Sequence, residues 1–183
     1  MRLFVGIDIP QEIKNTLAGL IDSMRPIANL RWSQTSNLHV TTKFIGEWPE
    51  ARLGEVKAQL ARMEHTSIPI SIRGLGWFPN PHTPRVFWAA VRAPESLGTL
   101  AGKTEEALSA LGIARETRPY SPHLTLARIE NQPALAGLRR HVAALPSDDF
   151  GEFKATAFHL YHSQPGPNRS IYTKLESFPL TES

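Results

Sequence analysis

Two histidines, His39 and His123, are each followed two residues later by a threonine, Thr41 and Thr125. In a β-strand, residues i and i+2 project from the same face, so each imidazole shares a face with its threonine hydroxyl. An imidazole can move a proton near neutral pH, and a hydroxyl beside it can donate a hydrogen bond to a phosphate oxygen. Each motif therefore offers half of a site for chemistry at phosphorus.

Two such motifs together supply what an in-line displacement at phosphorus needs, a base on the attacking side and an acid on the leaving side. Because the unperturbed pKa of histidine is about 6.5, one imidazole can be neutral while the other is protonated. This chemistry requires no metal ion and no cofactor. A metal pair at His159 and His162 is not expected, because residues three apart in a strand lie on opposite faces.

The bare pattern is weak, because a chain with seven histidines is expected to contain roughly half an accidental His-x-Thr. Each copy is also compatible with a partly exposed strand histidine beside a threonine that favours β-structure. The context favours the chemical interpretation. Both copies open a run of alternating apolar and polar residues, and they occupy corresponding places in the two halves of the chain.

The spacing of apolar residues predicts strands and helices in similar order in both halves of the chain. The expected strands are residues 3–9, 38–45, 68–78, 85–92, 123–129, 153–162 and 171–178. The expected helices are residues 13–24, 53–63, 97–111 and 135–145. We predict an α+β, bilobal pseudo-twofold fold, a single two-lobed domain over residues 1–183, with two mainly antiparallel sheets backed by helices and the active cleft between them.

The composition of the 183 residues excludes several classes of protein. The absence of cysteine excludes disulfides, thiolate zinc sites and cysteine nucleophiles, and it fits a cytoplasmic location best. No apolar run approaches the roughly 20 residues that span a bilayer, so no membrane partner is expected. The net charge of +3 agrees with a phosphate-bearing partner but does not decide the matter.

Residues 39–46 and 118–128 closely resemble the two signatures of the two-histidine (2H) phosphoesterases. Within that superfamily they are most similar to the bacterial and archaeal RNA 2′,3′-cyclic phosphodiesterases, historically called 2′-5′ RNA ligases. The resemblance continues over residues 3–7, 85–88 and 163–166. One departure is Thr42, where the family usually carries an apolar residue. Because alternation turns Thr42 to the core, this change should affect packing more than chemistry.

The resemblance implies hydrolysis of a terminal 2′,3′-cyclic phosphate of RNA to a 2′-phosphate. On this basis His123 is the general base that activates water, and His39 is the proton donor to the leaving 3′ oxygen. Thr41, Thr125 and Arg128 are implied to hold the phosphoryl oxygens. Reversible joining of 2′-5′ linked RNA ends is an implied side activity, since the same groups serve transfer in both directions.

Two basic residues near the motifs are further candidates. Simple alternation puts Arg128 on the face of Leu124, so Arg128 reaches the site only if the strand twists or carries a β-bulge. Lys43 alternates with Thr41, which predicts a positive charge at the rim of the cleft.

Aromatic residues near the motifs offer faces on which a base can stack. We predict this role, or a place at the cleft rim, for Tyr120 and Trp48. Phe44 is expected to pack in the core instead.

Two other functions remain open from sequence. One is a phosphodiesterase for another small cyclic nucleotide phosphate or a 2′-5′ oligonucleotide, which differs in pocket shape rather than in chemistry. The other is a non-catalytic nucleotide- or RNA-binding module, although binding alone needs no pair of proton carriers. The expected partner is RNA with a 2′,3′-cyclic phosphate end, or a small cyclic nucleotide, and the protein is expected to be a monomer.

Overall fold

The computed structural model describes residues 1–182. The strands are β1 (Arg2–Asp8), β2 (Arg31–Trp32), β3 (His39–Glu47), β4 (Ile68–Phe78), β5 (Val86–Arg92), β6 (His123–Arg128), β7 (Asp149–Ala155), β8 (Ala157–Pro165) and β9 (Ser170–Pro179). The helices are α1 (Gln11–Met24), α2 (Leu53–Ala61), α3 (Glu95–Ser109) and α4 (Ala136–Ala143), with 3₁₀ turns η1 (Thr35–Asn37) and η2 (Glu50–Arg52). Among these helices, none has the length and apolar character needed to cross a membrane.

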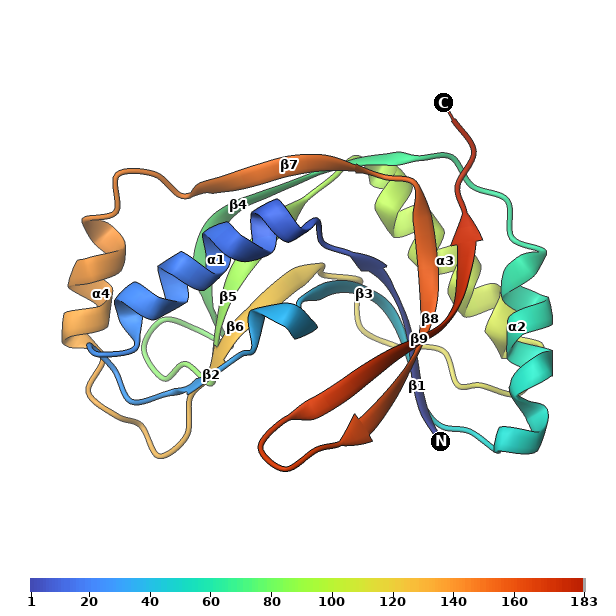
Figure 1. The fold of residues 1–183 in the computed structure, drawn as a ribbon, viewed down its shortest axis with the longest axis horizontal. Coiled ribbons are helices and arrows are strands. Elements are labelled where there is room, and N and C mark those ends of the chain that lie inside the picture. Colours follow the sequence, from blue (N-terminus) through green and yellow to red (C-terminus); the bar gives the residue numbers. More distant parts are fainter. Residues whose placement is uncertain (183) are drawn as a thin grey trace.

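The strands form two sheets that make up two lobes (Figure 1). One sheet has the order β3-β1-β8-β9 and the other β2-β6-β5-β4-β7. Neighbouring strands pair antiparallel throughout both sheets. Strand β3 of the first sheet contacts β6 of the second, so the two strands that carry His-x-Thr motifs meet where the lobes join. The predicted bilobal α+β architecture is confirmed.

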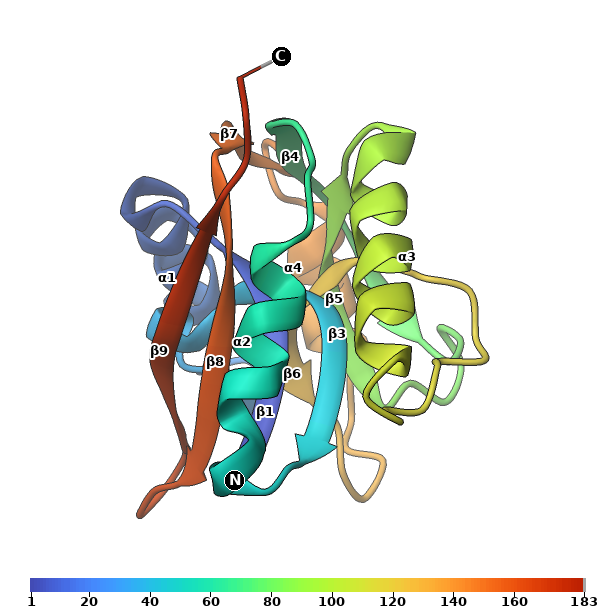
Figure 2. The same ribbon diagram turned by 90° about the vertical axis from the view of Figure 1, so that its right-hand side faces the viewer.

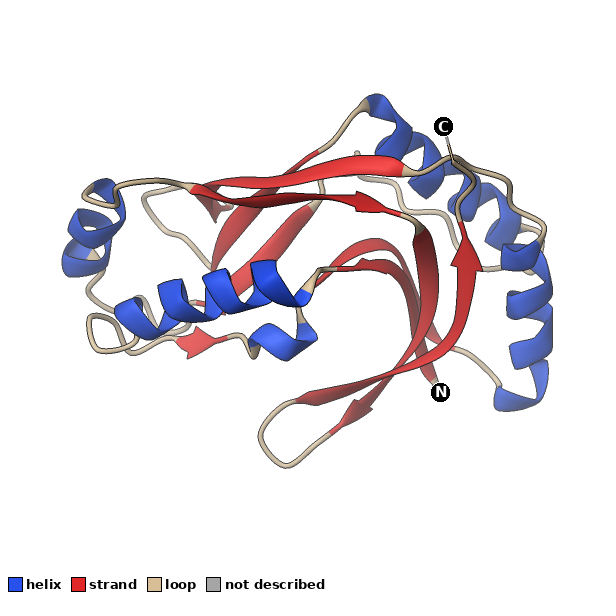
Figure 3. Ribbon diagram, turned by 45° about the horizontal axis from the view of Figure 1, so that its top comes forward, coloured by secondary structure: helices blue, strands red, loops and turns tan. Residues whose placement is uncertain are grey.

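Helices back each sheet (Figures 2 and 3). On the four-stranded sheet, α2 and α3 pack together and contact β9 and β3. On the five-stranded sheet, α1 contacts β7, and α4 lies beside α1, where Ser23 Oγ and His141 Nε2 are 3.1 Å apart. The core lies under these helices. We call the opposite face of each sheet its helix-free face.

The two lobes do not correspond to the two halves of the chain. Each sheet takes strands from both halves, and α1 packs on the sheet to which β1 does not belong. The single strand expected over 153–162 is two strands, because the chain passes at Thr156 from β7 in one sheet to β8 in the other. The apolar pattern continues across this break, so periodicity does not reveal it. The two-residue β2 was not predicted, since it is too short to show alternation.

A β-bulge interrupts β3 directly after its His-x-Thr motif. In the pairing with β1, Thr41 lies opposite Gly6 and Lys43 lies opposite Val5, which leaves Thr42 as an extra residue. A bulge shifts the alternation by one position, so the residues beyond it change faces. Thr42 and Lys43 are accordingly both buried, one after the other.

The same irregularity occurs at the same place in β6. In the pairing with β5, Thr125 lies opposite Trp88 and Ala127 opposite Phe87, so Leu126 is the extra residue. Leu126 and Ala127 are again both buried, and the residue that follows returns to the helix-free face. The pseudo-twofold relation of the lobes therefore extends to a bulge one residue after each motif threonine.

The helix-free face of the five-stranded sheet has a tightly packed aromatic floor. A Cβ atom on Gly76 would lie 2.2 Å from Cζ2 of Trp88, so the indole lies directly against the glycine backbone. The Phe78 ring is 4.9 Å from the Trp88 ring and 5.2 Å from the ring of His123. The glycine thus sets the position of the aromatic layer beside one motif histidine.

We expect Gly76→Ala to lower the free energy of unfolding by about 1–3 kcal/mol, because the added methyl group forces the indole from its position. Chemical denaturation measures the change. The matched control is Gly102→Ala in the middle of α3, where a Cβ meets no atom within 4 Å. There alanine should stabilise by roughly 0.5–1 kcal/mol through helix propensity. Equal effects of the two substitutions would contradict the packing argument.

Candidate active site

Each motif histidine is held by the backbone carbonyl two residues before it. His39 Nδ1 lies 2.8 Å from the carbonyl oxygen of Asn37, and His123 Nδ1 lies 2.9 Å from that of Ser121. A carbonyl oxygen can only accept, so in both rings Nδ1 carries the hydrogen and donates it. The neutral rings therefore keep Nε2 as an unprotonated nitrogen that can accept a proton. The two halves of the site share one tautomer and one means of orienting the ring.

The surroundings of His39 fix its ring further. The Phe4 ring stacks on the imidazole at 4.4 Å, and the edge of Tyr172 approaches it at 5.2 Å. On neighbouring β1, a Cβ on Gly6 would lie 2.9 Å from the carbonyl oxygen of Val40 and 3.3 Å from Cδ2 of His39. Only glycine leaves space for the ring at this point of the strand.

The motif threonines lie on the helix-free faces as alternation predicts, and both are half-buried. Their backbone carbonyls are used to join segments: Tyr120 Oη donates to the oxygen of Thr41 at 2.8 Å, and Ser33 Oγ donates to that of Thr125 at 2.7 Å. Burial raises the pKa of Tyr120, which keeps its hydroxyl protonated and able to donate. Tyr120 thus connects the segment before β6 to β3.

The bulge in β6 brings Arg128 to the helix-free face, on the side of His123 and Thr125. The sequence required such a bulge for Arg128 to reach the site, and the structure contains it. The equivalent residue after the bulge in β3 is Phe44, whose side chain is 72% exposed. The expectation that Phe44 packs in the core is therefore wrong, because the same shift of alternation carries it out of the core.

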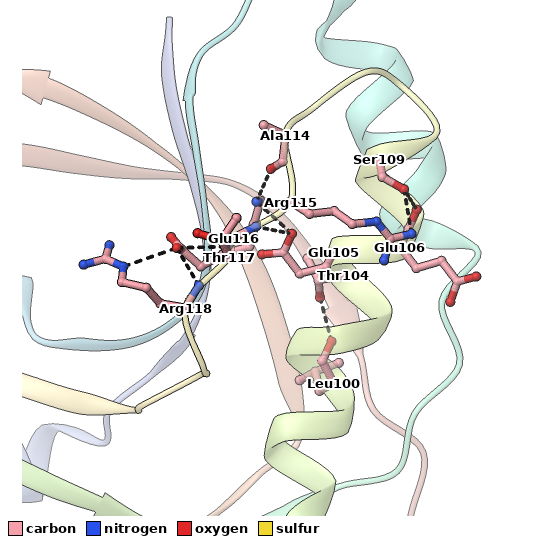
Figure 4. Close-up of polar contacts among 11 residues, drawn as sticks. Leu100, Thr104, Glu105, Glu106, Ser109, Ala114, Arg115, Glu116, Thr117 and Arg118 are labelled. Carbon is pink, nitrogen blue, oxygen red and sulfur yellow. Dashed lines mark hydrogen bonds and ion pairs between the residues drawn. The ribbon is translucent and has the colours of Figure 1, made fainter.

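Lys43 does not lie at the rim of the site, and that prediction is corrected. The bulge turns its side chain into the core, where Nζ donates to Glu105 Oε2 of α3 at 2.9 Å and to the carbonyl oxygen of Ala114 at 2.7 Å. Glu105 also accepts from the backbone N–H of Glu116 (Figure 4). This buried ion pair ties the loop that leads toward His123 to the strand that carries His39.

Trp48 is also not a base-stacking residue at the site. Its side chain is buried, its indole N–H donates to the carbonyl oxygen of Arg52 at 3.0 Å, and the Arg52 guanidinium lies 4.5 Å from the ring centre. Trp48 follows the end of β3, beyond a second irregularity in the pairing with β1. It therefore supports the turn before α2 rather than offering a face to a nucleotide.

A charged cluster on the four-stranded sheet was missed by the sequence analysis. Asp8 lies directly opposite His39 in the β1–β3 pairing. Its carboxylate accepts hydrogen bonds from Tyr161 and Lys174, and His159 Nε2 lies 3.6 Å away. Asp8 alternates with Gly6 along β1, but nothing in the sequence alone shows which strand β1 pairs with.

The cluster acts on the pKa values of its members. Burial raises the pKa of Asp8, but hydrogen bonds from Lys174 and Tyr161 outweigh it and the net pKa is lowered. Burial lowers the pKa of His39, while the Asn37 carbonyl and the negative charge of Asp8 act in the opposite direction. In the free protein the neutral form of His39 is therefore favoured relative to an exposed histidine.

The described residues hold no group of three or more His, Cys, Asp or Glu side chains placed to bind a metal ion. Two surface hollows lie away from the motifs, one beside Asp148 and one beside Phe153, and neither is lined by a histidine. The candidate site is therefore defined by the chemistry and orientation of the motif side chains on the helix-free faces.

Comparison with known proteins agrees with this geometry. The profile of the LigT-like phosphoesterases matches residues 7–88 and 90–172, which is most of the chain. The chain belongs to this family. Relatives of the chain include an RNA 2′,3′-cyclic phosphodiesterase of Archaeoglobus fulgidus, which is 32% identical with 97% of this chain and 99% of the relative covered. Another, from Thermus thermophilus, is 35% identical with 98% and 90% covered.

Solved structures of the LigT-like phosphoesterase fold superpose over nearly the whole chain. The crystal structure of TT0787 of Thermus thermophilus matches with a TM-score of 0.81 and 31% identity, covering 100% of this chain and 99% of that one. The structure of E. coli LigT complexed with 3′-AMP matches with a TM-score of 0.80 and 25% identity, covering 99% and 98%. The resemblance seen in the two motifs thus extends to the complete fold.

We expect Asp8→Asn to lower the pKa of His39 further below its ordinary value. The substitution removes a negative charge that favours the imidazolium and leaves the positive charge of Lys174 without its partner. An NMR titration of the histidine ring protons measures this without any assay of activity. Asp22→Asn on the exposed face of α1 is the control and should leave the His39 titration unchanged. A rise in the pKa of His39 in Asp8→Asn would show that the negative charge of Asp8 does not favour the imidazolium form of His39.

The buried ion pair should be costly to break from one side. We expect Lys43→Met to lower the free energy of unfolding by about 3 kcal/mol, because it leaves the carboxylate of Glu105 largely enclosed without a cation. The double variant Lys43→Met/Glu105→Gln should recover part of this loss. Arg73→Gln breaks an exposed pair with Asp149 and serves as the control with a much smaller effect. Additive losses in the double variant would show that the pair is not coupled.

Proposed function

We propose that the protein is an RNA 2′,3′-cyclic phosphodiesterase that uses His39 and His123 as acid and base without a metal ion. One observation carries the proposal: both imidazoles donate Nδ1–H to the carbonyl two residues before them and keep Nε2 available, on two strands that contact each other. A pair of oriented proton carriers is what transfer at phosphorus requires and what simple binding does not. The names of the relatives support the choice of substrate.

In the proposed reaction His123 Nε2 takes a proton from water while the water oxygen attacks phosphorus. The bond from phosphorus to the 3′ oxygen breaks on the opposite side, and His39 gives its proton to that oxygen. The product is a 2′-phosphate. Thr41 and Thr125 donate hydrogen bonds to the phosphoryl oxygens, and Arg128 offers a charged fork of donors to the same group.

The role of His39 depends on how its pKa responds to the substrate. The lowered pKa of His39 in the free protein favours its neutral form, which taken alone suits a base. The anionic phosphate adds to the negative charge of Asp8 and moves the pKa of His39 upward, toward the protonated form that an acid needs. We therefore keep His39 as the acid when the substrate is bound.

A second candidate is phosphodiester hydrolysis in another small nucleotide, and the complex of E. coli LigT with 3′-AMP favours nucleotide binding in this family. The chemistry is the same and the difference lies in the bound groups around the phosphate. Joining of RNA ends through a 2′-5′ linkage uses the same residues, with the 5′ hydroxyl of a second RNA attacking phosphorus in place of water and the bond to the 3′ oxygen breaking as before. A non-catalytic binding module is the proposal to be excluded by assay.

An oligoribonucleotide with a terminal 2′,3′-cyclic phosphate should be hydrolysed by the wild-type protein in the presence of a chelator. We expect His39→Ala and His123→Ala each to lower kcat by about 10²–10⁴-fold, because each removes one proton transfer. His82 is exposed in a loop, so the variant His82→Ala is the matched control and should retain full activity.

The outcomes of this assay separate the alternatives. Absence of turnover by the wild type favours a binding module, and loss of turnover with chelator refutes metal independence. Chromatographic identification of the product isomer tests the roles of the histidines. A 2′-phosphate agrees with His39 as the acid, whereas a 3′-phosphate reverses the assignment.

A further inference from the structure

Two arginines lie directly opposite each other on the five-stranded sheet. In the antiparallel pairing of β2 with β6, Arg31 is the partner of Arg128. Directly opposed residues in antiparallel strands have Cβ atoms about 4.5–5.5 Å apart, and like charges at such positions are destabilising. This arrangement therefore costs stability in the free protein.

The surrounding residues do little to offset that repulsion. Arg128 is exposed and forms no ion pair within residues 1–182. Arg31 has one acidic neighbour, with its Nη1 3.7 Å from Glu130 Oε1, and both of these side chains are largely exposed. An exposed pair at this distance contributes little. The site has a local excess of positive charge on the helix-free face.

The position of Arg31 is fixed by the strand that carries it. The next residue, Trp32, is opposite buried Ala127, and its indole N–H donates to the carbonyl oxygen of Ala28 at 3.1 Å. The backbone N–H of Ser33 then donates a hydrogen bond to the carbonyl oxygen of Leu126, the extra residue of the β6 bulge, with the nitrogen 2.8 Å from the oxygen. Because Trp32 faces the core, alternation turns Arg31 to the helix-free face.

Two cations of the four-stranded sheet are already held by acidic partners. Lys174 is bound to Asp8, and Lys43 is bound to Glu105. On the five-stranded sheet, exposed positive charge continues from Thr125 past Arg128 to Arg31. Strand β2 is the edge strand of its sheet, so this line of charge ends at the edge of the sheet.

We propose that Arg31 binds the phosphodiester that precedes the terminal cyclic phosphate, so that the site takes the end of an RNA chain in preference to a mononucleotide. This rests on the proposed function, in which Arg128 holds the reacting phosphate. The phosphodiester next to the reacting phosphate of the RNA neutralises the charge of Arg31, and this relieves the repulsion between the guanidinium groups of Arg31 and Arg128. Glu130 competes with that phosphate for Arg31.

Equilibrium binding tests the proposal without depending on catalysis. The probes are adenosine 2′-phosphate, the diadenosine dinucleotide ending in the same 2′-phosphate, and that dinucleotide with a neutral methylphosphonate linkage. For Arg31→Ala we expect the Kd of the charged dinucleotide to rise about tenfold, the order of one charge-assisted contact. The Kd of the mononucleotide should stay within about twofold, since Arg128 is intact.

Four further comparisons make the test specific. The wild type should bind the neutral-linkage dinucleotide as weakly as Arg31→Ala binds the charged one. The Kd of the neutral-linkage dinucleotide should be the same for Arg31→Ala as for the wild type. The salt dependence of log Kd for the charged dinucleotide should become shallower by about 0.7 in Arg31→Ala. Glu130→Gln should tighten charged-dinucleotide binding, and Arg62→Ala at the end of α2 should change nothing.

The proposal is overturned if Arg31→Ala weakens mononucleotide and dinucleotide equally, or if it changes neither. A wild type that binds these probes but fails to hydrolyse a cyclic phosphate refutes the proposed function, while the dinucleotide comparison still decides the role of Arg31. Discrimination between the charged and neutral linkages that is lost in Arg31→Ala supports the assignment.

Discussion

The β-bulge one residue after each His-x-Thr motif determines which side chains accompany the histidines. Unbroken alternation would place Lys43 beside His39 and turn the guanidinium of Arg128 toward the helices, where a lone charge is very costly. The bulges reverse both placements. Lys43 enters the core and finds Glu105, and Arg128 reaches the face of His123. The same local backbone irregularity places a lysine in a buried ion pair on one strand and an arginine on the face of a motif histidine on the other.

The same irregularity makes the two ends of a nearly symmetric site chemically different. The two histidines are oriented identically, but the equivalent positions after the bulges carry an exposed phenylalanine, Phe44, and an exposed arginine, Arg128. On one sheet the buried ring of Phe4 and the partly buried ring of Tyr172 pack against His39. Aromatic rings and a guanidinium therefore lie on different sheets, beside two imidazoles that are oriented alike.

The sequence predicted what depends on neighbours along the chain and missed what depends on strand pairing. The strands of both motifs and most other elements follow from local alternation, and so does the need for a bulge before Arg128. Lys43 and Phe44 were misplaced because the bulge in β3 appears only in its pairing with β1, and Trp48 lies beyond a second shift. The cluster around Asp8 was missed because it unites β1, β8 and β9.

The exchange of strands between the lobes has a consequence for synthesis of the protein. Strand β1 is an inner strand whose partners are β3 on one side and β8 on the other, and β8 pairs in turn with β9 at the end of the chain. Strand β1 is synthesised first, but the edge that pairs with β8 therefore stays without its hydrogen-bond partner until residues 159–163 have emerged from the ribosome. Contacts of such long sequence separation form slowly. The lobe that holds His39 is completed last, although its first strand is made first.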